Sequence, residues 1–162
     1  MDRFLLHYTL HSATLVEERL RQRMDALGIR HKQARVIDAV ARMEPTSQAA
    51  LAREFDVSPA SMSTMTVRLI EAGYVSRKID PGEARSNVLH LTEKGRGLLE
   101  DIYQVWRDMG ALIVEQLGPE DAQTYARLTR KLRDSLGGHV PGTPRKPSST
   151  RRPLAPKRQD TR

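Results

Sequence analysis

The chain has 162 residues, a formal net charge of +7 and no cysteine. The lack of cysteine excludes disulfide bridges, thiolate metal sites and cysteine nucleophiles. No uninterrupted apolar run approaches the ~18 residues that a membrane-spanning helix needs, and the first residues are too charged for a secretory signal. We therefore expect a cytoplasmic protein with no membrane partner.

The positive charge is concentrated near the C-terminal end. Seven Lys or Arg residues and one Asp give residues 139–162 a net charge of +6, whereas residues 1–138 carry only +1. The same segment holds five of the nine prolines and few large apolar side chains. Such a composition cannot bury enough apolar surface to offset its ordering entropy. The sequence thus predicts one domain over 1–138 and a basic, proline-rich, disordered tail over 139–162.

Apolar spacing predicts helices over the first part of the domain. Apolar residues three or four apart mark a first helix over about 3–27 and a second helix that ends before Pro45. Thr46 or Ser47 is expected to cap a short third helix that ends near Phe55.

A fourth helix is expected from Ser58 to Gly73, because Ser58 followed by Pro59 is a helix cap with proline at the first helical position. Two short runs rich in β-branched or apolar residues then flank a strong turn signal at 80–83. These runs, 74–79 and 88–91, predict a β-hairpin.

Two further helices are expected after the hairpin, the first capped by Thr92 and interrupted at Gly118-Pro119. The third and fourth helices are the informative pair. Ala52 supplies a small side chain where they would cross, and Asp56 stands at a turn position that favours glycine. Asp tolerates the left-handed backbone conformation better than most residues.

A helix-turn-helix followed directly by a hairpin is a winged helix-turn-helix. The predicted fold is therefore mainly α with a small β-hairpin wing and flanking dimerisation helices. The DNA-reading unit is expected over about 30–92, and the dimerisation helices over about 3–27 and 92–138. Long amphipathic helices on both sides of so small a unit have more apolar surface than it can cover, which favours a homodimer.

In this fold the fourth helix enters a major groove, while an arginine on a projecting wing can enter a minor groove. Hydroxyls near the start of that helix can reach bases or phosphates, although they can also be mere caps and solvated surface. Residues 46–92 hold five basic and five acidic side chains, so bulk attraction to DNA is weak and placement is decisive. The predicted DNA-binding residues are Ser58, Ser61, Ser63, Thr64, Arg68, Arg77, Lys78 and Arg85.

Several of these segments resemble the MarR family of transcriptional regulators. The resemblance covers about 3–138 and is carried by Asp80-Pro81, Arg85 and Leu91-Thr92-Glu93-Lys94-Gly95-Arg96, together with Leu51-Ala52, Val57-Ser58-Pro59 and Glu71-Ala72-Gly73-Tyr74-Val75-Ser76-Arg77. It implies a homodimeric winged-helix repressor or activator whose DNA affinity often responds to a small, frequently phenolic ligand. The wing departs from the family pattern at Glu83, where Asp is usual.

We therefore expect a DNA-binding transcriptional regulator, a repressor released by a small aromatic or phenolic ligand, that reads a palindromic operator in double-stranded DNA as a dimer. The alternative is a winged-helix protein-interaction module without sequence-specific DNA binding, which the neutral, Ser/Thr-rich fourth helix keeps open. An effector pocket is predicted between the dimerisation helices and the reading unit. Its predicted lining residues are Tyr8, His11, His31, Arg35 and Trp106.

Enzymatic readings find no support in the sequence. It has no nucleophile-elbow, phosphate-loop or zinc-protease motif, so we predict no catalytic residues and no cofactor. His7 and His11 have a spacing compatible with a metal ion, but two histidines without a nearby third ligand more often form an ordinary surface pair. No metal site is predicted.

Overall fold

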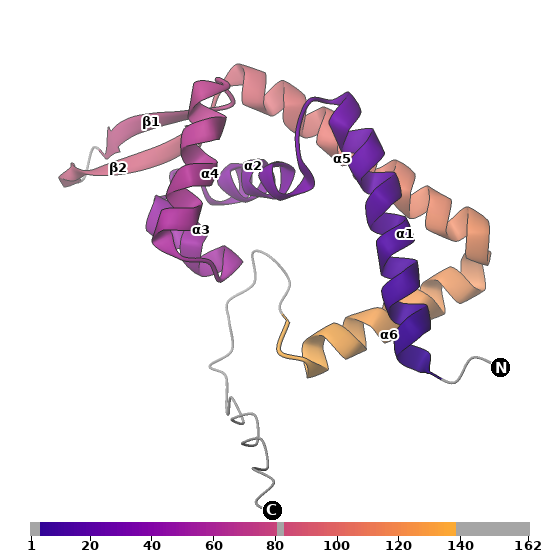
Figure 1. Cartoon of the computed structure of the whole chain (residues 1–162). Coiled ribbons are helices and arrows are strands. Elements are labelled where there is room, and N and C mark those ends of the chain that lie inside the picture. Colours follow the sequence, from indigo (N-terminus) through magenta and orange to yellow (C-terminus); the bar gives the residue numbers. More distant parts are fainter. Residues whose placement is uncertain (1–3, 81–82, 139–162) are drawn as a thin grey trace, which may run out of the picture.

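The computed structural model describes residues 4–80 and 83–138, and the side chains of 80 and 83–86 are outside the description. The predicted disordered tail at 139–162 and Pro81 and Gly82 of the predicted turn also lie outside the described residues. Within the described part the chain folds into six helices and one two-stranded antiparallel hairpin. This architecture confirms the predicted winged helix-turn-helix (Figure 1).

The order of elements follows the predicted order along the chain. The helices and strands are α1 (Leu5–Ala26), α2 (His31–Met43), α3 (Gln48–Phe55), α4 (Pro59–Glu71), β1 (Val75–Asp80), β2 (Glu83–Leu91), α5 (Glu93–Leu117) and α6 (Pro119–Ser135). The hairpin projects from the end of α4, and α5 leads away from it to α6 (Figure 1). Among the described residues, no helix has both the length and the apolar character needed to cross a bilayer.

The helix caps agree with the residue types at the helix starts. Ser47 accepts a hydrogen bond from the N–H of Ala50, Ser58 from that of Ser61, and Thr92 from that of Gly95. Of the two predicted caps of α3, Ser47 is therefore the one used. Thr46 is buried and pairs with Leu89 of β2 through two backbone hydrogen bonds instead.

The hairpin is longer and less regular than predicted. We expected its second strand over 88–91, but β2 begins at Glu83. Ile79 pairs with Asn87 and the next residue, Asp80, pairs with Glu83, so the register is interrupted between these pairs. β2 therefore contains extra residues opposite the end of β1, and the arm of the wing extends beyond the segment that β-branched residues mark.

The core lies where α2, α3, α4, the base of the hairpin and the start of α5 meet. Its fully buried large side chains are Met24, Ile37, Leu51, Met62, Leu69, Leu89, Ile102, Val36, Val40 and Val75, with the hydroxyl of Thr66. At 25 cal/mol per Å² of apolar surface, each fully buried side chain of this size contributes about 1.5–3 kcal/mol to folding. This core packs α2, α3, α4, the base of the hairpin and the start of α5 together.

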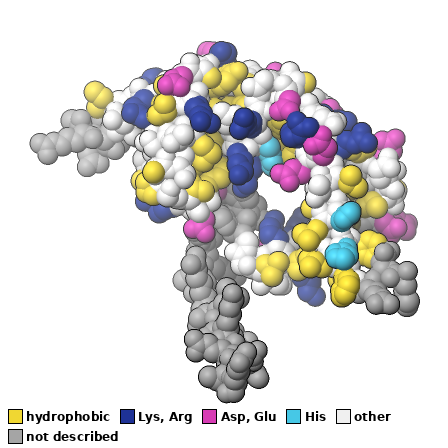
Figure 2. All heavy atoms as spheres, viewed as in Figure 1, with side chains coloured by type: hydrophobic (Ala, Val, Ile, Leu, Met, Phe, Trp, Pro, Cys, Tyr) yellow, Lys and Arg dark blue, Asp and Glu magenta, His cyan; other side chains and the backbone are white. Residues whose placement is uncertain are grey.

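In α1, the end of α5 and α6, many large apolar side chains are exposed instead of buried. Met24 is the buried residue of α1, whereas large apolar side chains on the rest of that helix are exposed. The exposed large apolar residues of the N-terminal part and of the α5–α6 end are Phe4, Leu5, Leu6, Tyr8, Leu10, Leu15, Val16, Val114, Leu117, Tyr125, Leu128, Leu132 and Leu136. Hydrophobic side chains gather over the N-terminal end of α1 in Figure 2.

Candidate nucleic-acid interface

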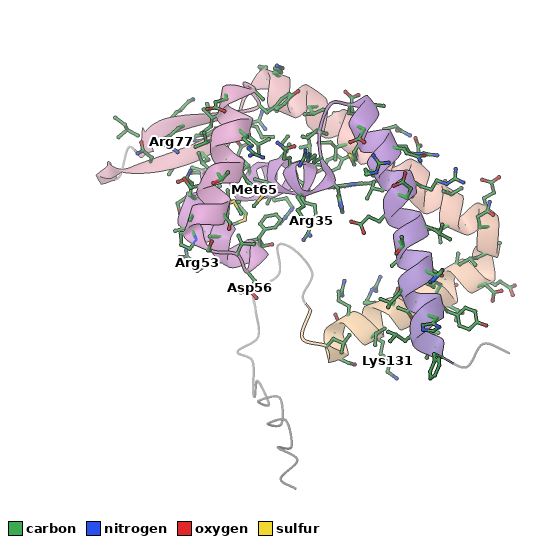
Figure 3. All side chains as sticks on the ribbon, in the orientation of Figure 1. Arg35, Arg53, Asp56, Met65, Arg77 and Lys131 are labelled. Carbon is green, nitrogen blue, oxygen red and sulfur yellow. The ribbon has the colours of Figure 1, made fainter. Side chains whose placement is uncertain are left out.

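The turn between α3 and α4 has the geometry that the sequence predicts. Asp56 ends α3 with φ 52° and ψ 45°, which is the left-handed conformation. The N–H of Val57 then donates to the carbonyl of Ala52 over 3.1 Å. Ala52 is only 4% exposed, since its small side chain lets the two helices approach each other. Asp56 lies at the turn at the lower end of the reading unit (Figure 3).

One face of α4 is buried against α3 and the core. Met62, Thr66 and Leu69 on that face are fully or almost fully buried. The side-chain amide of Gln48, at the start of α3, donates to the Thr66 hydroxyl over 2.6 Å. That hydroxyl can donate in turn to the carbonyl of Met62 or Ser63, each at 3.0 Å. This hydrogen bond between Gln48 and Thr66, which no local sequence pattern indicated, holds α4 against α3.

The opposite face of α4 presents the predicted hydroxyls. Ser58, Ser61 and Thr64 are exposed, and Ser63 is half-buried. The oxygens of Ser58 and Ser61 lie 2.9 Å apart, while Thr64 donates to the carbonyl of Ala60 over 3.1 Å. Thr64 is therefore better placed to accept a hydrogen bond than to donate one, which suits an amino group of adenine or cytosine.

The cations of α4 and β1 are exposed near this face. Arg68 lies in the last turns of α4, and Arg77 and Lys78 follow on β1. Successive residues of a strand point to opposite faces of the hairpin. The face of the hairpin that meets a DNA groove therefore carries either Arg77 or Lys78, but not both. Arg77 extends from the wing in Figure 3. Arg85 has its backbone in β2, but its side chain is outside the described residues.

The five predicted effector residues are spread over three helices. Tyr8 and His11 are exposed on α1, and His31 and Arg35 lie one turn apart on α2. Burial, followed by the charge of Arg35, lowers the pKa of His31 below its ordinary value. The guanidinium of Arg35 stacks over the ring of Phe55 at 5.1 Å from its centre.

Trp106 is half-buried on α5, where its ring centre lies 5.8 Å from that of Tyr103. The Tyr103 hydroxyl donates to Asp38 of α2 over 2.9 Å, so Trp106 stands beside a contact between α5 and the reading unit. A hollow of about 770 Å³ lies elsewhere, between α5 and α6. It is lined by Ile113, Val114, Ala122 and Tyr125 among others, and by none of the five predicted residues.

The residue geometry defines a class of protein: a winged helix-turn-helix with an exposed, hydroxyl-bearing helix and cations on the adjacent hairpin. Comparison with known proteins agrees. Residues 27–86 match the sequence profile of the MarR family. The chain is 33% identical over 86 residues to the HTH-type transcriptional repressor Rv2887 of Mycobacterium tuberculosis. That segment covers 53% of this chain and 62% of the relative, less than two thirds of its length.

Solved structures show the same fold over most of the chain. A structure of the Mycobacterium tuberculosis MarR family protein Rv2887 with salicylic acid is 26% identical, with a TM-score of 0.64 over 81% of this chain and 98% of that one. The structure of MarR superposes with a TM-score of 0.69 at 20% identity, covering 84% and 94% of the two chains. A Staphylococcus aureus MepR–DNA complex gives 0.67 at 18% identity, covering 82% and 99%. This chain therefore has the winged helix-turn-helix fold of the MarR structures, and its residues 27–86 are similar in sequence to the MarR family.

Proposed function

We propose that this protein is a cytoplasmic, homodimeric, sequence-specific DNA-binding regulator of transcription, a repressor that leaves its operator when a small aromatic ligand binds. The observation that carries the proposal is the exposed face of α4. Its buried side is tied to the core and to Gln48, so the opposite side presents Ser58, Ser61, Thr64 and Arg68 at a fixed angle beside the cations of β1. The relative Rv2887 is described as a repressor, and MepR has been solved with bound DNA.

The dimer is supported by the apolar surface of the outer helices. Leu5 is 82% exposed on α1 and Leu132 is 50% exposed on α6, within a larger set of exposed apolar side chains on these elements. Apolar surface on this scale marks an interaction site. A second copy of the chain suits it, because a two-fold dimer places two α4 helices about one turn of duplex apart and reads a palindrome.

The function is tested first at the wing. Arg85→Ala is expected to weaken operator binding by about 1–3 kcal/mol, because one groove contact is lost. Thermal stability should stay within about 0.5 kcal/mol, as for surface substitutions in general. Fluorescence anisotropy on a labelled operator duplex measures the first quantity, and thermal unfolding the second. Unchanged operator affinity would show that Arg85 does not read DNA.

The release by an aromatic ligand is tested with the single tryptophan. Rv2887 has been solved with salicylic acid and with p-aminosalicylic acid, which motivates salicylate as the probe. We expect salicylate to change the Trp106 emission over the same concentrations that release operator DNA. Arg35→Gln should weaken both effects by about tenfold, because a charged hydrogen bond to the carboxylate is lost. Release of DNA with unmoved emission would place the pocket away from Trp106.

The alternative function is a winged-helix module that binds a protein partner. Its support is the balance of five basic and five acidic residues over 46–92. The salt dependence of duplex binding distinguishes the two functions. A regulator that neutralises phosphates loses affinity steeply with salt and still prefers its operator, whereas an interaction module shows no such preference at any salt concentration.

A further inference from the structure

The carboxylate of Glu44 joins three elements at the base of the wing. Glu44 follows the last residue of α2, and its Oε2 accepts a hydrogen bond from the backbone N–H of Leu91 over 2.9 Å. Its Oε1 accepts from the guanidinium of Arg96, in the first turns of α5, over 2.6 Å. The Nδ1 atom of His90 lies 3.9 Å from the same carboxylate. Glu44 therefore contacts the end of β2 and the start of α5 together.

Thr46, two residues after Glu44, makes a second contact with β2. The N–H of Leu89 donates to the carbonyl of Thr46 over 2.7 Å, and the N–H of Thr46 donates to the carbonyl of Leu89 over 3.3 Å. Thr46 is only 4% exposed. The segment 44–46 thus runs along the edge of β2 that β1 leaves free. A two-stranded hairpin alone is marginally stable in water, so contacts at its base determine its direction.

The electrostatics keep this carboxylate charged. The Glu44 side chain is 17% exposed and the Arg96 side chain is 48% exposed, so water screens the pair only in part. Burial raises the pKa of Glu44, but the hydrogen bond from Leu91 and the hydrogen bond and charge of Arg96 outweigh it. The net pKa lies below the ordinary 4.5. Both acceptor oxygens are therefore available at neutral pH, and a charge-assisted hydrogen bond is stronger than a neutral one.

We propose that Glu44 is a positioning residue for the wing, which fixes the direction of the hairpin relative to α2 and α5 without touching DNA. The inference rests on the proposed DNA-binding function. Loss of the carboxylate frees the N–H of Leu91 and the guanidinium of Arg96 and lets the wing change direction. The wing contacts with DNA are then weakened, while the contacts of α4 are kept.

A double-mutant cycle on DNA tests this role. Glu44→Ala should lower operator affinity about tenfold, the equivalent of one lost charged hydrogen bond. In a wing variant with Arg77→Ala, Lys78→Ala and Arg85→Ala, the same substitution should cost less than about twofold, because the wing contacts it misplaces are already absent. In an Arg68→Ala background on α4, the full tenfold cost should remain. Equal costs in both backgrounds would overturn the proposal in favour of a general loss of stability.

Two further variants distinguish a positioning role of Glu44 from a simple effect of its charge. Glu44→Gln keeps an oxygen acceptor for the N–H of Leu91 but loses the charge that faces Arg96, so its affinity should lie between those of the wild type and Glu44→Ala. It also serves as the test variant if Glu44→Ala does not fold. Glu100→Ala removes an exposed acid from α5 and should leave operator affinity unchanged. A loss in Glu100→Ala equal to that in Glu44→Ala would show that charge alone is responsible and overturn the proposal.

Amide hydrogen exchange tests the contact between Glu44 and the N–H of Leu91 without any DNA. The N–H of Leu91 should exchange at least about tenfold faster in Glu44→Ala, while the N–H of Leu51 in α3 should exchange as in the wild type. If the wild-type protein binds no duplex selectively, the proposed function fails. The exchange rate of the Leu91 N–H still shows whether Glu44 holds the base of the wing. Unchanged exchange at Leu91 in Glu44→Ala would refute the positioning role even if operator binding is confirmed.

Discussion

Replacing Gly95 by alanine is expected to destabilise the protein by about 2–4 kcal/mol, the cost of forcing an extra carbon into a packed site. A Cβ at this position would overlap the backbone carbonyl oxygen of Tyr74. The start of α5 cannot move aside freely. The Thr92 hydroxyl donates to the carbonyl of Gly73 over 2.7 Å, and the Lys94 ammonium donates to that of Ala72 over 2.9 Å.

Gly97 gives the matched control, because it lies in the same helix and a Cβ there would meet nothing within 4 Å. Gly97→Ala should leave stability unchanged or raise it by up to about 1 kcal/mol, since alanine has the higher helix propensity. Urea denaturation of both variants measures the difference. Equal midpoints for Gly95→Ala and Gly97→Ala would show that the start of α5 does not lie as close to the backbone of Tyr74 as described.

The second large effect is expected at the proposed dimer interface. A variant with Leu5→Glu and Leu132→Glu places charges at positions that are 82% and 50% exposed in a single chain. The isolated chain should tolerate them, whereas a dimer that covers them must bury unpaired charges at about 3–5 kcal/mol each. We expect the dissociation constant of the dimer to rise at least ~100-fold in this variant, which sedimentation velocity measures. Selective operator binding should fall with it.

Ile79→Glu is the control for that experiment, because Ile79 is 67% exposed but lies on the wing. Its sedimentation should match that of the wild type. A wild-type protein that sediments as a monomer at micromolar concentration would contradict the dimer outright. Loss of the dimer in Ile79→Glu as well would mean that added charge, and not its position, is responsible.

Local signals predicted much of the reading unit. Ser58 before Pro59 predicted the start of α4, and Asp56 predicted the left-handed turn, because each effect depends only on the residue and its neighbours in the chain. Patterns of this kind are written in a few consecutive residues.

The contacts that orient these elements join residues far apart in the sequence, so no local pattern predicts them. Glu44 meets Leu91 and Arg96 across 47 and 52 residues of sequence, and Gln48 meets Thr66 across 18. A lone glutamate before a proline has no local pattern that indicates such partners. The added length of β2 also escaped prediction, because the irregular pairing after Ile79 depends on the approach of two strands and not on β-propensity.

We propose that the exposed face of α4 and the wing together read a DNA sequence. The most direct measurement is selection of duplexes from a random pool by the full chain, followed by anisotropy titrations of the selected duplex and of a scrambled one at several salt concentrations. We predict an inverted repeat with half-sites about one helical turn apart, bound at least ~1,000-fold more tightly than the scrambled duplex. Equal affinity for both duplexes at every salt concentration would contradict the claim.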